Sequence, residues 1–251
     1  MEILKRYKIY AFLILAGFLF QSCDSEEAFD CFKKSGELTT VRIDNFPDFA
    51  ELLIHDDIEL EIVETDQEYF ELTYGENLIA KIVMDQNKDS LSFFNENFCG
   101  WTRDFERPKL KWFTNKSTIR INCLSSGKIT VEDTLRNDFV IRIQNATNEV
   151  DLNLNNNNTT LLSNSSSNFQ ISGKSNGLRI AAYFNDGKFD CSELIVNRAN
   201  VLQRGYNDII VNVKDSLVGS IENAGRILYK GNPGVKVEVS NGGELIHLDQ
   251  D

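Results

Sequence analysis

Along the C-terminal half of the chain, single apolar residues recur about every twenty positions, each after a short polar turn. Seven such positions, called the anchors, are separated by 21, 19, 20, 20, 18 and 18 residues. Another apolar residue usually follows two positions after the anchor, a period typical of a β-strand whose alternate side chains point to one face. The anchors are Ile129, Val150, Phe169, Phe189, Ile209, Ile227 and Leu245. The residues two positions after them are Val131, Leu152, Ile171, Cys191, Val211, Tyr229 and His247.

The turns before the anchors share the pattern Asn-x-Gly-x-apolar. It occurs as "NDGKF" at 185–189, "NAGRI" at 223–227 and "NGGEL" at 241–245, with a serine version, "SSGKI", at 125–129. Asparagine and glycine suit the left-handed backbone conformations that other residues resist, so we expect such conformations here. The segment "GNPG" at 231–234 has no phosphate-loop spacing around it and is predicted to turn the chain into its last coil.

One repeat of this length cannot bury its apolar face alone, so the repeats must stack. The sequence therefore predicts an all-β fold, a parallel β-solenoid (β-helix) with about seven C-terminal coils of 18–21 residues. A β-sandwich of hairpins is the competing fold, but it does not explain the constant repeat length. We expect one domain over 36–251, with a less regular strand-rich layer at 36–115 and regular repeats at 116–251.

The N-terminus has the features of an export signal. Positive residues precede an apolar run at 9–20, and these twelve residues are too few to span a bilayer. Ser22-Cys23 resembles a bacterial lipobox, so we expect a lipoprotein signal peptide at 1–22, lipid attachment at Cys23 and an acidic tether at 23–35. A plain signal peptide with an incidental cysteine and a transmembrane anchor remain alternatives.

The chain is acidic, with a net charge of −12 and a pI near 4.7. Phosphate backbones are repelled by such a protein, so no nucleic-acid partner is expected. The acidic cluster "CDSEEAFD" at 23–30 resembles signals that send lipoproteins to the outside of the outer membrane. We expect an outer-membrane, lipid-anchored and surface-exposed protein. A solvated tether on an inward-facing, periplasmic protein is the alternative.

Candidate chemistry is sparse. Asp151 and Asp190 follow their anchors directly and would project from one face two coils apart, with Gln170 between them. This spacing fits an inverting carboxylate pair only loosely, and solvated strand residues explain it as well. The chain has two histidines and lacks the motifs of phosphate-binding loops and serine hydrolases, so we expect no catalytic residue, cofactor or metal.

One basic and aromatic segment stands out in this acidic chain. Arginine and aromatic side chains are favoured at interface hot spots, so this segment is the candidate partner surface. The alternative is that its aromatic residues cover the open end of the solenoid, as terminal repeats must. The residues are Trp101, Arg103, Phe105, Arg107 and Trp112.

Several ordered motifs resemble one known family. "YKGNP" at 229–233, "VKVEVSNGGEL" at 235–245, "DCFKKSGE" at 30–37 and "NENFCGWTRDFERP" at 95–108 are together similar to the head GIN domain family of Bacteroidetes. The similarity covers about residues 30–248. It implies a β-helical protein that is exported or lipid-anchored and is described as an adhesin. The family brings no established catalytic residues.

The cysteines other than Cys23 divide into two pairs. Cys31 and Cys99 lie in two of the motifs that resemble the family, and we expect a disulfide between them. Cys123 and Cys191 are expected to be free, because three coils, about 14 Å of axial rise, would separate them. Cys191 falls in the inward column and is expected to be a small buried hydrophobe.

Taken together, these features predict a lipid-anchored cell-envelope protein without catalytic activity that acts as an adhesin or binding scaffold. Its partners would be the lipid of the outer membrane and an unidentified glycan or protein. Two alternatives remain open. One is a carbohydrate-active β-helix enzyme, and the other is a periplasmic accessory protein for envelope maintenance or signalling.

Overall fold

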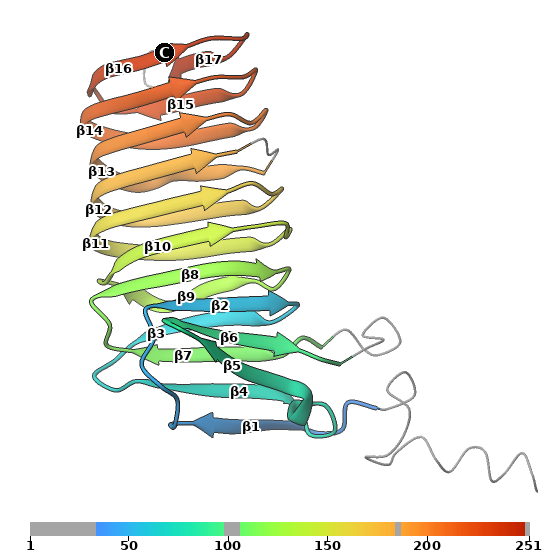
Figure 1. The fold of residues 1–251 in the computed structure, drawn as a ribbon. Coiled ribbons are helices and arrows are strands. Elements are labelled where there is room, and N and C mark those ends of the chain that lie inside the picture. The colour runs from blue at the N-terminus through green and yellow to red at the C-terminus, as the bar shows by residue number, and fades with distance from the viewer. Residues whose placement is uncertain (1–33, 98–105, 184–186, 249–251) are drawn as a thin grey trace, which may run out of the picture.

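The computed structural model describes residues 34–97, 106–183 and 187–248. Its seventeen strands form one continuous sheet that winds into a parallel β-solenoid of about six turns (Figure 1). The predicted fold class is confirmed, with slightly fewer coils than the expected seven. Among the described residues the helical element is a single 3-10 turn, η2 (Ile79–Lys81), and no helix there is long and apolar enough to cross a membrane.

Each regular coil has two strand segments on opposite sides of the apolar core, which we call face A and face B. Four long strands turn a corner and contribute their first half to face A and their second half to face B: β11 (Glu149–Ser163), β12 (Asn168–Ala182), β13 (Phe189–Gln203) and β14 (Asp208–Ile221). Face A also contains β9 (Ile129–Leu135), β15 (Arg226–Lys230) and β17 (Glu244–His247). Face B also contains β8 (Thr118–Ser125), β10 (Asp138–Ile143) and β16 (Gly234–Val239).

The N-terminal strands belong to the same solenoid, but their spatial order differs from their order along the chain. The coil of β2 (Glu51–Asp56) and β3 (Glu59–Glu64) lies between two coils that come later in the sequence. β2 pairs in parallel with β8 and with β6 (Ser90–Asn95), and β3 pairs in parallel with β9 and with β7 (Lys109–Thr114). The chain therefore passes over a whole coil between β7 and β8.

Antiparallel strands close the N-terminal end of the solenoid. β4 (Tyr69–Gly75) pairs with β7, and β1 (Leu38–Ile43) pairs with β4 at the edge of face A. β5 (Ile82–Asn87) pairs with β6 on face B. This arrangement ends the parallel repeat at the end of the molecule where the described chain begins (Figure 1).

The predicted anchors stack in register on face A. Successive pairs along the column are Ile129–Val150, Val150–Phe169, Phe169–Phe189, Phe189–Ile209, Ile209–Ile227 and Ile227–Leu245. The rings of Phe169 and Phe189 lie parallel with their centroids 4.4 Å apart. The column continues into the N-terminal coils through Leu60, which pairs with Ile129. The spacing of the anchors is therefore the number of residues in each coil.

The glycines of the repeated turn act through close approach and not through a left-handed backbone. Gly127, Gly187, Gly225 and Gly243 are absent from the described glycines with positive φ, so the expectation based on backbone conformation is wrong for them. A Cβ at Gly127 would overlap the carbonyl oxygen of Ile58 in the neighbouring coil. The expectation is confirmed within the repeated turn "NGGEL" at Asn241 (φ 53°) and Gly242 (φ 80°), and the left-handed conformation also occurs at Gly231 (φ 87°) in the predicted "GNPG" turn.

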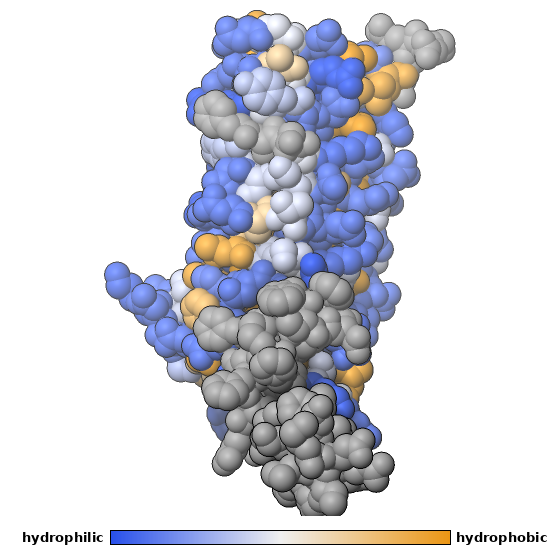
Figure 2. Space-filling model, turned by 90° about the vertical axis from the view of Figure 1, so that its right-hand side faces the viewer, coloured by the Kyte–Doolittle hydropathy of each residue, from blue (hydrophilic) through white to orange (hydrophobic). Residues whose placement is uncertain are grey.

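Asparagine side chains connect neighbouring coils at the corners. Asn156 Nδ2 donates to the carbonyl oxygen of Asn137 at 3.0 Å, and Asn137 Nδ2 donates to that of Lys116 at 2.5 Å. The asparagine-rich run at 153–168 is thus in phase with the repeat. The edge formed by the turns before the anchors is mainly hydrophilic (Figure 2).

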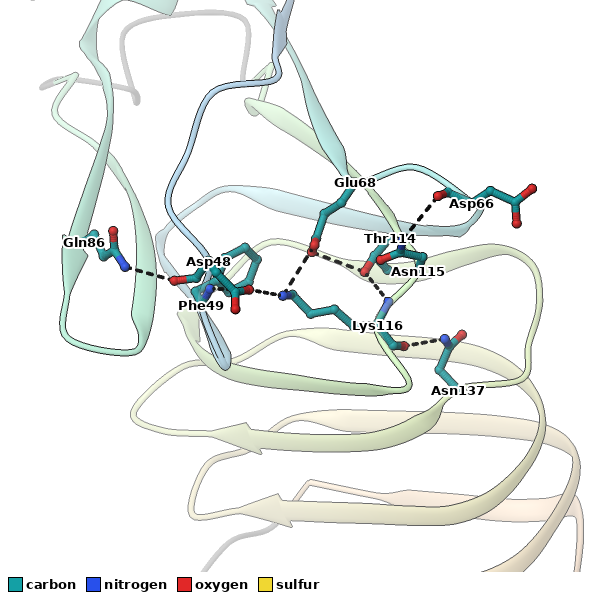
Figure 3. Close-up of polar contacts among 9 residues, drawn as sticks. All are labelled: Asp48, Phe49, Asp66, Glu68, Gln86, Thr114, Asn115, Lys116 and Asn137. Atoms are coloured by element: carbon teal, nitrogen blue, oxygen red, sulfur yellow. Dashed lines mark hydrogen bonds and ion pairs between the residues drawn. The ribbon is translucent and has the colours of Figure 1, made fainter.

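Lys116 holds together the site where the chain crosses between coils (Figure 3). Its Nζ lies 2.9 Å from Asp48 Oδ1 and 3.4 Å from Glu68 Oε2, and it sits 4.5 Å from the ring centroid of Phe49. Only 17% of the Lys116 side chain is exposed. The network joins the loops before β2 and β4 to the connection between β7 and β8.

Gly127→Ala is expected to destabilise the protein by about 2 kcal/mol or more, because the new Cβ must push the backbone of Ile58 away. Chemical denaturation measures this change. Gly234→Ala is the matched control, since the nearest atom to its Cβ would lie 3.6 Å away, an ordinary contact. Equal stability of the two variants would contradict the proposed close approach.

Lys116→Met is expected to lower the free energy of unfolding at pH 7 by about 1 kcal/mol, roughly 3 °C in melting temperature. The hydrogen bond from Lys116 lowers the pKa of Asp48 in the folded protein. The ion pair therefore stabilises the fold fully above the pKa that Asp48 has in the unfolded chain, and this stabilisation is lost as the pH falls through the pKa of Asp48 in the folded protein. The gap between variant and wild type should therefore narrow in acid. Lys128→Met, which removes a more exposed pair with Asp151, is the control. A gap that is unchanged at low pH would argue against the ion pair.

Candidate binding surface

Face B carries a shallow hollow centred on Gly177. Two outward columns meet there, one through Asn158, Gly177, Arg198 and Ser216, and the other through Thr160, Arg179, Asn200 and Val218. Because Gly177 has no side chain, the first column has a gap between its neighbours on β11 and β13. The hollow has a volume of about 300 Å³ and is open to solvent.

Two arginines border this hollow. Arg179 and Arg198 lie on neighbouring strands, two positions out of register, and both side chains are exposed. Neither forms an ion pair or a side-chain hydrogen bond with any residue in the part of the chain that the structure describes. By contrast, Arg204 lies 2.6 Å from Glu222, and Arg226 lies 2.6 Å from Asp208. The hollow thus concentrates two uncompensated positive charges in an acidic protein.

The remaining lining is polar and uncharged. Asn158, Thr160, Asn200 and Ser216 supply amide and hydroxyl groups, and Val218 is 37% exposed beside them. The nearby carboxylate of Asp138 is engaged by Asn158, whose Nδ2 donates to Asp138 Oδ2 at 2.9 Å. The surface can therefore offer hydrogen bonds and two guanidinium groups to an anionic, hydroxyl-rich ligand.

The partner surface predicted from the sequence is not brought together as a whole. Trp101, Arg103 and Phe105 lie outside the described residues. Arg107 is at the surface, where its Nη1 donates to the carbonyl oxygen of Ser126 at 2.8 Å. It also lines a second hollow, of about 370 Å³, next to Glu106 and Lys109. Lipid attachment at Cys23 and the disulfide between Cys31 and Cys99 likewise fall outside the described residues.

Trp112 is not a surface residue, and its placement in the partner surface was wrong. It is 0% exposed and belongs to the core near the N-terminal end of the solenoid. Its ring centroid lies 5.6 Å from that of Phe49 and 6.0 Å from that of Phe70. The alternation of Leu110 and Trp112 with charged neighbours in β7 is a sequence signal for this inward position. Its ring thus fills the core of a coil that has β3 on one side and β4 on the other.

The aspartates considered for catalysis occupy the predicted column. Asp151 pairs with Gln170, and Gln170 with Asp190, which places the two carboxylates two coils apart on face A. Asp151 lies 3.6 Å from Lys128, and Asp190 lies 2.9 Å from Lys188. Burial opposes ionisation of Asp190, but hydrogen bonds from Lys188 and Ser192 outweigh it and lower its pKa. A lowered pKa is the opposite of what a general acid requires.

The two described cysteines are free and buried, as expected. Cys123 and Cys191 are each 0% exposed, on face B and face A respectively. Burial raises the pKa of the Cys123 thiol to about 11 and also raises that of Cys191. Asn148 Nδ2 lies 3.2 Å from the Cys123 sulfur. No group of three or more potential metal ligands occurs among the residues that the structure describes.

Cys123 and Cys191 are therefore expected to resist alkylation in the native protein, because burial removes both access and thiolate character. Native labelling with one maleimide, followed by denaturation and labelling with a second, distinguishes the sites by peptide mapping. Both cysteines should carry only the second label. Native labelling of Cys191 at the rate of an exposed thiol would show that the inward column is wrongly placed.

Comparison with solved structures supports the architecture. A crystal structure described as a putative adhesin from Bacteroides fragilis is 16% identical, with 84% of this chain and 97% of that chain covered and a TM-score of 0.72. A second, from Parabacteroides distasonis, is 18% identical, with 85% and 98% covered and a TM-score of 0.58. A protein described as a putative lipid binding protein from Parabacteroides distasonis is 17% identical, with 85% and 98% covered and a TM-score of 0.54. At these identities the likeness shows a shared fold.

A search of curated proteins gave no match. The sequence profile of one family does match, over residues 48–233, which include most of the described strands of both faces. The resemblance found in the sequence motifs is thereby confirmed. The chain belongs to the family described as "Putative auto-transporter adhesin, head GIN domain".

Proposed function

We propose that the protein is a lipid-anchored envelope adhesin that binds acidic glycans on face B and carries out no catalysis. Membership of an adhesin family supports a role at the cell envelope. The observation that carries the proposal is the pair of uncompensated arginines around the hollow at Gly177. This hollow combines an open concave surface with two guanidinium groups that have no ion-pair partner among the described residues.

Acidic glycans match this surface chemically. Guanidinium groups bind carboxylates and sulfates through paired, charge-assisted hydrogen bonds. The amides and hydroxyls of Asn158, Thr160 and Asn200 are suited to the hydroxyl groups of a sugar. The repeated rungs of face B form a flat surface along which a polysaccharide chain could lie. A neutral glycan would leave both arginines unused.

The lipid anchor is supported by the sequence and by the position of the first described residues. The lipobox-like Ser22-Cys23 and the acidic residues that follow precede Lys34, where the described chain begins. From there the chain enters β1 at the N-terminal end of the solenoid (Figure 1). An anchor at Cys23 would therefore hold the molecule by this end and leave face B accessible along its length.

The enzyme alternative finds little support in the carboxylates of face A. Asp151 and Asp190 are each paired with a lysine, and the pKa of Asp190 is lowered, whereas protonation of a leaving group requires a raised one. Measuring turnover alongside binding tests this alternative, since a lyase or hydrolase would shorten the glycan.

The full chain is expected to bind polyuronates or sulfated polysaccharides but not neutral ones of equal length. Arg179→Ala combined with Arg198→Ala should weaken binding at least tenfold, because each lost charge-assisted hydrogen bond contributes about 1.5–3 kcal/mol. Surface-immobilised glycans with label-free detection measure the affinity, and size analysis of the glycan afterwards measures turnover.

Arg226→Ala is the matched control, since it removes one positive charge from face A, where Asp208 is its partner. It should bind like the wild type. Equal binding by the double variant and the wild type would refute the site at Gly177. Binding to a protein receptor without any glycan binding would refute the proposed ligand class, and glycan shortening would refute the absence of catalysis.

A further inference from the structure

The C-terminal coil exposes core positions that are covered everywhere else along the regular repeat. β16 pairs with β14, and β17 pairs with β15, and no described strand lies on their other side. Val235 and Val239 occupy the same inward columns as Leu217 and Ile221, which are 0% exposed. The two valines are nevertheless 40% and 48% exposed. The N-terminal end, by contrast, is closed by antiparallel strands.

The backbone of this last coil also has hydrogen-bonding groups without a partner among the described residues. Ser240 N–H donates to the carbonyl oxygen of Ile221 at 2.9 Å, which fixes the alternation along β16. Lys236 and Glu238, in phase with Ser240, therefore direct their N–H and C=O groups toward β14. The N–H and C=O groups of the three valines, Val235, Val237 and Val239, point to the open side.

The sequence of β16 is self-complementary. It reads "VKVEV" over 235–239, with valines inward and Lys236 and Glu238 outward. In an antiparallel pair with a second copy centred on Val237, each lysine lies opposite a glutamate and every valine lies opposite a valine. Opposite charges in directly facing positions stabilise such a pair, whereas like charges destabilise it.

We propose that the open end of the C-terminal coil is a self-association surface, on which a second copy of this chain docks by antiparallel pairing of β16 with β16. The twofold axis passes through Val237. The facing valines then exchange the backbone hydrogen bonds that both copies leave unused. Lys236 and Glu238 fall in the positions between these bonds, where facing residues approach most closely. The same surface patch is used twice, as a closed dimer requires.

Other registers fail on charge or on orientation. Centring the pair on Lys236 or on Glu238 would place a like charge opposite that residue. If the twofold axis passed between two residues, each valine would face a lysine or a glutamate. The valines of one copy would then point outward, since side chains alternate between faces. Centring the pair on Val235 or on Val239 avoids like charges but leaves Lys236 and Glu238 without an opposite charge. Only the pairing centred on Val237 places each lysine opposite a glutamate.

The second strand of the last coil fits the same axis. Leu248 N–H donates to the carbonyl oxygen of Tyr229 at 2.9 Å, so Leu245 and His247 direct their backbone groups to the open side. Val237 precedes the turn at 240–243 by three residues, and Ile246 follows it by three. An axis normal to both faces can therefore pass near Val237 and Ile246, which brings Leu245 opposite His247 of the second copy.

This surface lies at the end of the solenoid opposite β1 (Figure 1). If the proposed anchor at Cys23 holds the N-terminal end, the self-association surface is the tip of the molecule, and dimers would join molecules on facing membranes. That cellular role rests on the proposed function. The dimer itself does not, because it involves neither the hollow at Gly177 nor the anchor.

Sedimentation of the full chain in mild detergent, with protein and detergent mass separated, should detect a concentration-dependent dimer. Lys236→Glu and Glu238→Lys are each expected to lower the dimerisation constant at least tenfold, because each places like charges opposite one another. The double variant Lys236→Glu/Glu238→Lys should restore the dimer. An equimolar mixture of the two single variants should form heterodimers. The glycan-site variant Arg179→Ala/Arg198→Ala should dimerise like the wild type, so failure of this proposal is distinct from failure of the glycan site.

Val237→Pro tests the backbone pairing. Its N–H points to the open side, where a proline is tolerated, so the monomer should stay folded while the dimer is lost. Circular dichroism and melting temperature verify the fold. A wild-type protein that is monomeric at millimolar concentration would overturn the proposal. So would a dimer unaffected by either single charge reversal, or open-ended filaments in place of a closed dimer.

Discussion

The structure depends on the stacking of coils whose apolar faces cannot be buried within one coil. Each coil supplies a few inward side chains, and only the coil above and the coil below complete their burial. The anchor column from Leu60 through Ile129 to Leu245 shows this dependence directly, because each member pairs in register with the next. Backbone hydrogen bonds between coils then hold the same register, so burial and hydrogen bonding specify one pitch.

Stacking restricts the residue types at inward positions but not at outward ones. Side chains on faces A and B can vary without disturbing the core, which allows the carboxylates of Asp151 and Asp190 on one face and the arginines of Arg179 and Arg198 on the other. The same constraint makes the ends of the solenoid special. The N-terminal end is closed by antiparallel strands and an aromatic core cluster around Trp112, while the C-terminal coil keeps its valines and backbone groups exposed.

Much of the regular repeat could be predicted, because a single apolar residue, such as Val150 or Phe169, marks the same position in each coil. The insertion of the β2–β3 coil could not, since the alternation of "IELEIV" at 58–63 indicates a strand but not its neighbours. The glycine pattern was found for the wrong reason: Gly127 is required by the approach of Ile58 from a segment distant in sequence. The position of Trp112 was readable from its alternation with Lys111, yet a basic-aromatic composition suggested a surface. The lack of an ion-pair partner for Arg179 and Arg198 depends on which side chains surround them in space. The spacing of residues along the sequence does not give that information.

The central proposal is ligand recognition on face B, at the hollow bordered by Arg179 and Arg198. Photo-crosslinking of a bound acidic glycan, with the attachment sites mapped by mass spectrometry, tests this placement most directly. Saturable attachment to residues of β11 to β14 on face B is expected. Attachment concentrated at residues 98–108 or on face A, or no saturable attachment at all, would contradict it.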